Sequence, residues 1–114
     1  MKLGEMVSQL MIDCRKLVAY ALDPDNPVGQ HKAILFQRRL GYNLDNYETL
    51  LEQIERFAME GEAIATRLDE YGQRYQVDLV VTGVNDQTAT VRTAWIVEPG
   101  VEDCARLISL YVRK

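Results

Sequence analysis

The sequence has little that could hold a metal ion. It contains one histidine and two cysteines, Cys14 and Cys104, which lie far apart and form no CxxC pair. A structural zinc site needs about four such ligands at short, regular spacing, so this chain does not support one. Both cysteines have apolar neighbours in the sequence, which favours buried free thiols. A disulfide between them stays open.

Motifs for nucleotide cofactors and for hydrolysis are also missing. The chain has no GxGxxG, no P-loop, no GxSxG and no HExxH. No apolar run approaches the roughly 18 residues of a membrane-spanning helix, and the N-terminus MKLGEMVSQ lacks the apolar centre of a signal peptide. We therefore expect a cytoplasmic protein that needs no cofactor and has no membrane partner.

Positive charge is in the minority. Lysine and arginine number 13 against 17 acidic residues, for a net charge of −4, which argues against a general nucleic-acid coat. A local basic site is still compatible with this charge, because distant acids are screened within about 8 Å at physiological salt. The chain has 114 residues, of which 47% are hydrophobic. These values predict one domain, residues 1–114, with a single core.

Three helices are predicted in the first half of the chain. Residues 1–12 are ambiguous between a helix and an extended segment. Asp13 is a candidate N-cap for a helix over residues 14–22, which the turn-rich stretch DPDNPVG ends. A second helix follows Gly29 and Gln30, and Gly41 is suited to the C′ position that closes it.

The third helix has the strongest pattern in the chain. Either Asn43 or Asp45 can cap it, and Gly61 ends it. Its apolar residues recur at helical spacing, and its acids face away from them. The apolar positions are Tyr47, Leu50, Leu51, Ile54 and Phe57 or Ala58.

The second half changes to the two-residue period of strands. RYQVDLVVTG and TATVRTAWIV alternate apolar with polar residues and are joined by a hairpin loop, and ARLISLYV follows the break at EPG. Alternation places Arg92 and Thr93 on opposite faces and groups Trp95 with the core residues. The chain is therefore predicted to be α+β, with N-terminal helices packed on one face of a C-terminal antiparallel sheet of at least three strands.

The stretch GQHKAILF holds the only histidine, next to a lysine, at the start of the second predicted helix. Histidine titrates near neutrality and can act as an acid or a base. A helix N-terminus offers free N–H groups to an anion, and Lys32 would add charge. His31 and Lys32 are therefore candidates for holding a phosphodiester. The alternative is two polar residues in the first turn of an amphipathic helix, and the sequence leaves both open.

Polar side chains also follow the predicted strands. If one sheet face packs on helices, the other can carry a row of arginine, hydroxyl and aromatic groups, like the surface of metal-independent ribonucleases. Such enzymes need a base for the 2′-hydroxyl, an acid for the leaving oxygen and cations for the phosphorane charge. The alternative is a solvated face with ordinary cross-strand pairs. The residues concerned are Arg74, Arg92, Thr93, Ser109 and Tyr111.

Four stretches carry a resemblance to a known family. GQHKAILFQRRLGY, DEYGQRYQVDL, VRTAWIV and ARLISLYV resemble a bacterial family of short proteins catalogued as domain of unknown function 6883. Its pattern is similar to KLxxYxLxxxxPxGxHKAxxFxxxLGY, EYGxRYxVD, VRTAWIV and PRLxTxYV. The match covers about residues 13–112. This chain departs from the pattern at Ala105, where proline is usual, and at Ser109, where threonine is usual; the serine keeps the hydroxyl.

The resemblance implies a fold similar to the barnase, EndoU, colicin and RelE group of ribonucleases. It also implies relatives in bacterial toxin systems and phage proteins, with a small partner protein beside the stand-alone members. A shared fold alone does not establish a reaction. The pattern positions that carry over are Lys16, His31, Lys32, Arg74, Thr93, Trp95 and Tyr111.

Two main functions follow, and the sequence does not decide whether the chain is an enzyme. The first is a metal-independent, toxin-type RNA endonuclease, in which His31 acts as acid or base, Lys32 and Arg74 bind phosphate, and Ser109 and Tyr111 orient the RNA. The second is a non-catalytic protein-interaction module of a two-gene bacterial or phage-derived system, which binds a small antitoxin-like partner or forms a homodimer. A third, weaker interpretation is a small anion-binding protein.

Overall fold

The computed structural model describes residues 1–13 and 30–113. The helix predicted over residues 14–22 lies outside the described residues. The elements are α1 (Leu3–Met6), β1 (Gln9–Met11), α3 (Gln30–Leu40), α4 (Tyr47–Phe57), the 3₁₀ turn η2 (Ala58–Glu60), β2 (Ile64–Asp69), β3 (Gly72–Thr82), β4 (Thr88–Val97) and β5 (Cys104–Val112).

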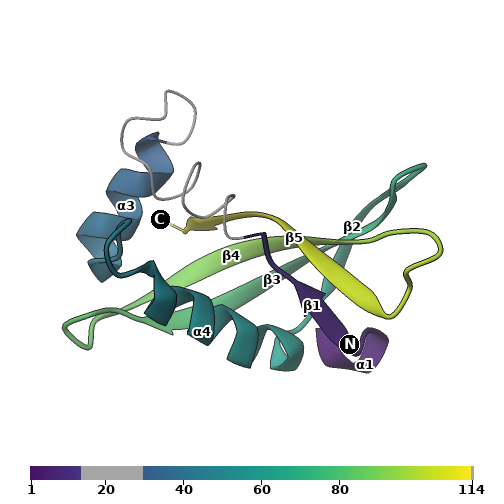
Figure 1. Cartoon of the computed structure of the whole chain (residues 1–114), viewed down its shortest axis with the longest axis horizontal. Coiled ribbons are helices and arrows are strands. Elements are labelled where there is room, and N and C mark those ends of the chain that lie inside the picture. Colours follow the sequence, from purple (N-terminus) through teal and green to yellow (C-terminus); the bar gives the residue numbers. More distant parts are fainter. Residues whose placement is uncertain (14–29, 114) are drawn as a thin grey trace.

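Five strands form one sheet in the order β1-β5-β4-β3-β2 (Figure 1). The pairs β2–β3, β3–β4 and β4–β5 are antiparallel, whereas β1 runs parallel to β5 with Gln9 opposite Cys104. The predicted α+β class is confirmed, but the sheet is mixed, because the ambiguous N-terminal segment contributes a parallel strand. Strand β2 was not predicted, because five of its six residues are exposed and show no alternation.

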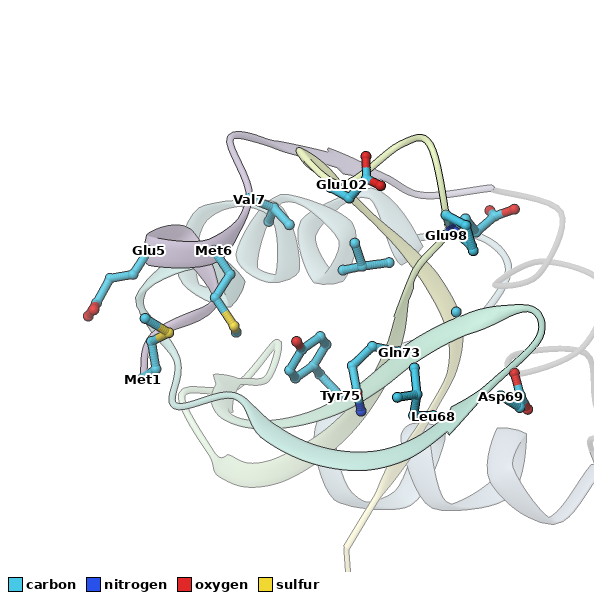
Figure 2. A pocket seen from close by; sticks show the side chains of 13 residues that line it. Met1, Glu5, Met6, Val7, Leu68, Asp69, Gln73, Tyr75, Glu98 and Glu102 are labelled. Carbon is cyan, nitrogen blue, oxygen red and sulfur yellow. The ribbon is translucent and has the colours of Figure 1, made fainter.

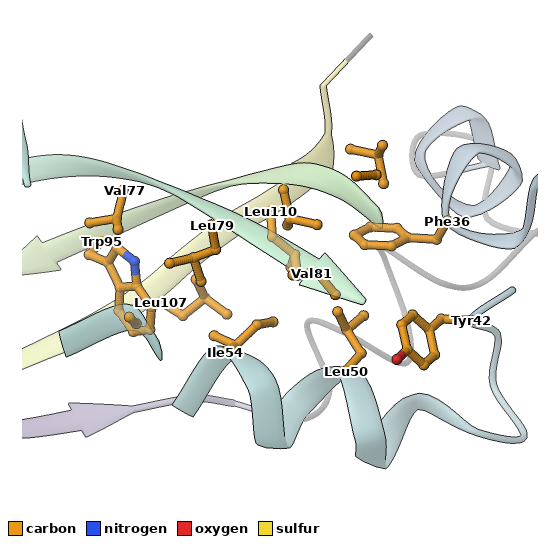
Figure 3. Close-up of a cluster of buried hydrophobic side chains, with 14 of the residues drawn as sticks. Phe36, Tyr42, Leu50, Ile54, Val77, Leu79, Val81, Trp95, Leu107 and Leu110 are labelled. Atoms are coloured by element: carbon orange, nitrogen blue, oxygen red, sulfur yellow. The ribbon is translucent and has the colours of Figure 1, made fainter. Parts of the chain in front are cut away.

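The helices cover one face of the sheet. Helix α4 packs against β3, and α3 lies at the end of the sheet beside the C-terminal end of β5 (Figure 1). Apolar residues at alternate strand positions meet the apolar stripes of both helices (Figure 3). The buried strand residues include Val77, Leu79, Val81, Val91, Trp95, Leu107 and Leu110, and the helices add Phe36, Leu40, Leu50 and Ile54.

Trp95 is a core residue, as its position in the strand pattern predicts. Its side chain is fully buried, and its Nε1–H donates to Thr93 Oγ1 at 2.8 Å. The Thr93 hydroxyl in turn donates to the carbonyl oxygen of Val77 on β3 at 2.7 Å. Both groups are therefore satisfied inside the core, as buried polar groups must be. The VRTAWIV stretch thus contains a buried hydrogen-bond chain that joins β4 to β3.

The ends of the two long helices differ slightly from the predictions. Gly41 closes α3 with a φ of 78°, as its C′ position predicts. The N-cap of α4 is Asn46 rather than Asn43 or Asp45. The reason is a local turn, because Asn46 Oδ1 accepts the backbone N–H of Asn43 while the Asn43 side chain accepts that of Asp45.

Candidate functional site

The face of the sheet opposite α4, here called the outer face, carries the polar side chains of the strands. On β4 and β5, Arg92 lies opposite Tyr111, and Ala94 lies opposite Ser109. Arg113 follows β5, and its backbone N–H donates to the carbonyl oxygen of Thr90. A β-bulge next to Ala94 lies between the Ser109 pair and the next pair along the sheet. Ser109, Tyr111 and Arg113 therefore form a row at alternate positions along one strand.

An acidic residue from β3 orders the arginines of this row. Arg92 donates twice to Asp78, from Nε to Oδ1 at 2.9 Å and from Nη2 to Oδ2 at 3.1 Å. Arg113 Nη1 donates to the same Oδ2 at 3.3 Å. The hydrogen bonds from Arg92 are the main reason why the pKa of Asp78 lies below its ordinary value, and Arg113 lowers it further. Asp78 is therefore an ionised counter-ion that orients Arg92, rather than a proton donor.

Lys32 reaches the same row from α3. Its Nζ lies 5.7 Å from the centroid of the Tyr111 ring, within the range of a cation–π contact. The pKa of Arg92 is raised, mainly by its hydrogen bonds to Asp78 and to a lesser extent by Tyr111, its cross-strand partner. The fold thus gathers Lys32, Arg92, Tyr111 and Arg113 at one end of the outer face.

The other predicted site residues have different positions. Ser109 is on the outer face, two residues before Tyr111. The backbone of His31 lies in the first turn of α3, directly before Lys32, but its side chain is outside what the structure describes. Arg74 is opposite Ile96 near the start of β3, where its Nη2 lies 3.6 Å from Asp69 Oδ2.

Arg74 is therefore separated from the Lys32–Tyr111 contact. It is four residues from Asp78 on β3, which is about 13 Å along a strand. Thr93 and Trp95, two positions of the family pattern, are buried under the helices and cannot touch a ligand on the outer face. Lys16 lies outside the described residues.

Sequence reasoning missed part of this cluster. Asp78, Arg113 and Arg39 were not among the predicted site residues. The alternation of β3 and β4 places Asp78 and Arg92 on the same face of the sheet, but the strand register decides that they pair. Arg39 follows Lys32 by about two helical turns, which places both on one side of α3.

A hollow of about 500 Å³ adjoins the cluster. We call it the arginine hollow. It opens between the end of α3 and the outer face, and its charged lining residues are both cations. The lining residues are Arg39, Val80, Thr88, Ala89, Thr90 and Arg113.

A second pocket, of about 560 Å³, lies beside the N-terminus and the β2–β3 turn (Figure 2), at the end of the sheet away from α3 (Figure 1). Its lining includes four carboxylates and no lysine or arginine side chain. Two of these acids, Asp69 and Glu98, are paired with arginines elsewhere on the sheet. The two hollows therefore differ in the charged side chains of their linings, which are acids in one and arginines in the other. The four acids are Glu5, Asp69, Glu98 and Glu102.

In residues 1–13 and 30–113, no group of three or more His, Cys, Asp or Glu side chains is arranged to hold a metal ion. In the same part of the chain, no helix is long and apolar enough to cross a membrane.

Comparisons with known proteins identify a family and a solved structure with a similar fold. The model of a family described as "Domain of unknown function (DUF6883)" matches residues 2–114. No curated protein matches the chain. A chain from the solved contact-dependent growth inhibition toxin–immunity protein complex of Klebsiella pneumoniae 342 is similar, with a TM-score of 0.68 over 91% of this chain and 93% of that chain. The two are 14% identical, so the similarity shows the fold alone.

Proposed function

This chain belongs to the DUF6883 family. For this member of the family we propose the function of a toxin-type RNA endonuclease that needs no metal ion. Its site is the end of the outer face where Lys32, Arg92 and Tyr111 meet. The similar fold comes from one chain of a toxin–immunity protein complex, which supports a role in a system of this kind, as a toxin or as an immunity-type protein.

One observation carries the proposal. In a protein with a net charge of −4, the fold places Lys32 over the Tyr111 ring beside Arg92 and Arg113. The acid that these arginines share, Asp78, carries a single charge. Arg92 and Arg113 therefore exceed their shared acid by one positive charge on a partly exposed surface, which suits a phosphodiester and the negative charge of its transition state.

The proposed reaction breaks the RNA backbone without water in the first step. The 2′-oxygen attacks the adjacent phosphorus after a base takes its proton, and the 5′-oxygen leaves after receiving a proton. The products are a 2′,3′-cyclic phosphate and a 5′-hydroxyl, so atoms and charge balance. In this scheme Lys32 and Arg92 hold the non-bridging phosphate oxygens.

The remaining residues take the roles that the sequence predicts. His31, beside Lys32 in the first turn of α3, moves the proton as acid or base. Ser109 and Tyr111 orient the nucleotide, with the Tyr111 ring as a surface on which a base can stack. Arg74 would meet a more distant phosphate, because an RNA strand running along the outer face reaches it about 13 Å farther on.

The test is RNA cleavage in EDTA by purified, partner-free protein. We expect the wild type to cut single-stranded RNA and His31→Ala to lose at least about a hundredfold in rate, because general acid–base catalysis contributes roughly 10²–10⁴-fold. Lys32→Ala should also lose activity. Arg56→Ala, at an exposed position of α4 and away from the outer face, is the control. Cleavage by His31→Ala and Lys32→Ala at the wild-type rate would contradict this site.

A second function, the non-catalytic interaction module, is favoured by the edge of the sheet. Apolar side chains on and beside β2 are exposed, with Leu68 at 75%, Tyr71 at 63% and Ile64 at 54%. Exposed apolar residues on an edge strand are a common contact surface for another chain. Folded protein that shows no cleavage, but whose partner binding is lost in Leu68→Glu, would support the module instead.

A further inference from the structure

We infer that the arginine hollow is a subsite for a second backbone phosphate of the RNA, next to the phosphate held by Lys32 and Arg92. This inference rests on the proposed function and extends it. It means that the substrate must reach beyond the cleaved linkage by at least one phosphate.

The first argument is the chemistry of the lining. Arg39 comes from α3 and Arg113 follows β5, so two guanidinium groups approach the hollow from different elements. Thr88 and Thr90 add hydroxyl groups from β4. Guanidinium and hydroxyl groups are common phosphate ligands in proteins that bind nucleic acid. The apolar side chain of Val80, which is 68% exposed, forms part of the floor on which a sugar or a base can rest.

The second argument is spacing. Arg113 lies two residues after Tyr111, so the two side chains project from the outer face about 7 Å apart along the strand. This separation is comparable with the distance between successive phosphates of an extended RNA strand. One linkage can therefore lie beside Tyr111 and Lys32 while the next lies in the hollow.

The third argument is charge balance. Arg113 shares Asp78 with Arg92, whereas the lining of the hollow contains no carboxylate. A bound phosphate would supply the anion that this lining does not. The pocket shown in Figure 2 is lined by acids instead, so of these two hollows the arginine hollow is the one that offers cations to a phosphate.

The chain offers a matched pair of variants for the test. Arg39 and Arg38 are neighbours on α3 and both are exposed, but only Arg39 lines the arginine hollow. Arg38 lines a different pocket, with Ile34 and Leu44. The probe is 2′-O-methyl oligouridine, which lacks the attacking hydroxyl and reports binding without cleavage.

We expect Arg39→Gln to weaken binding of this probe about tenfold, which is typical for the loss of one charge-assisted hydrogen bond. The slope of log affinity against log salt should fall by about 0.7, the value for one phosphate contact on a single strand. Arg38→Gln should match the wild type in both measurements. Equal affinities and equal slopes for Arg39→Gln and Arg38→Gln would overturn the subsite.

Cleavage kinetics separate this inference from the proposed function. The substrates are UpU and UpU with a phosphate added at the 5′ or the 3′ end. Arg39→Gln should raise KM about tenfold for one of the phosphorylated substrates and leave the kinetics for UpU unchanged. If the wild type cuts all three equally well, the subsite is wrong and the endonuclease stands.

Failure of the proposed reaction and failure of the phosphate subsite give different results. If the wild type cuts nothing but the probe still binds through Arg39, the reaction is wrong and the phosphate subsite stands. Polyglutamate of equal charge is the final control. If it binds as tightly as the oligouridine, the hollow responds to negative charge alone, as it would to an acidic protein partner, and the phosphate assignment is overturned.

Discussion

Replacing Thr93 with valine tests whether the VRTAWIV stretch serves the core or a ligand. Valine has nearly the same shape, so the change removes the hydroxyl without creating a cavity. It removes the acceptor for Trp95 Nε1 and the donor to Val77, both at fully buried positions. An orphaned buried donor costs about 1–3 kcal/mol, and the second hydrogen bond contributes about 1 kcal/mol. We therefore expect Thr93→Val to lower the free energy of unfolding by about 2–4 kcal/mol.

This loss is large compared with a total stability of about 5–15 kcal/mol. Urea unfolding followed by the fluorescence of Trp95, the only tryptophan, measures it. Thr93→Ser is the control that keeps the hydroxyl, and it should lose only about 1 kcal/mol for the missing methyl group. In a Trp95→Phe background there is no Trp95 Nε1–H to be left without an acceptor, so Thr93→Val should cost only about 1 kcal/mol. Circular dichroism follows unfolding in this background.

The same variants also separate structure from function. Folded Thr93→Val protein should bind the RNA probe like the wild type, because Thr93 faces the core rather than the outer face. A loss of stability below about 0.5 kcal/mol would refute the argument for a buried hydrogen-bond chain. So would an equal loss in both backgrounds.

Two further predictions concern the same sheet. The pKa of Asp78 is lower in the folded than in the unfolded chain, so its pairing with Arg92 stabilises the fold above about pH 4, and this stabilisation is lost as the pH falls through the lowered pKa. The difference between the urea midpoints of the wild type and Asp78→Asn should therefore shrink from pH 7 to pH 3. A difference that widens over this range would contradict the sign of the pKa shift. Gly72 has a φ of 132°, and a Cβ there would meet the carbonyl oxygen of Val97. Gly72→Ala should therefore cost about 2 kcal/mol or more. Gly100→Ala, at a φ of 84° with no atom within 4 Å of a new Cβ, should cost only about 1 kcal/mol, and equal thermal stabilities of the two variants would argue against the clash.

Local patterns in the sequence predicted most of the elements. The alternation of TATVRTAWIV matches β4 from Thr88 to Val97, and the apolar stripe of the third predicted helix matches α4. These patterns are reliable because one face of each element is buried, which imposes a period on the apolar residues. Strand β2 shows the converse, because an exposed edge strand leaves no such period.

The candidate site was predicted in part. His31 and Lys32 stand out in the sequence as a histidine–lysine pair at a helix start, and Tyr111 was assigned to a strand. That Lys32 rests over the Tyr111 ring depends on where α3 crosses the end of the sheet, which no local pattern specifies. The pairing of Asp78 with Arg92 depends on strand register in the same way.

The sequence by itself determined which residues must be buried and the period with which they recur, because burial of apolar surface acts on each element separately. It also determined that Arg92 and Thr93 face opposite sides of their strand, since side chains alternate along any strand. Only the tertiary structure decided which polar groups become neighbours. Strand order and register separated Arg74 from the site and brought Arg39 and Arg113 to it, because these contacts join residues that are distant in the chain.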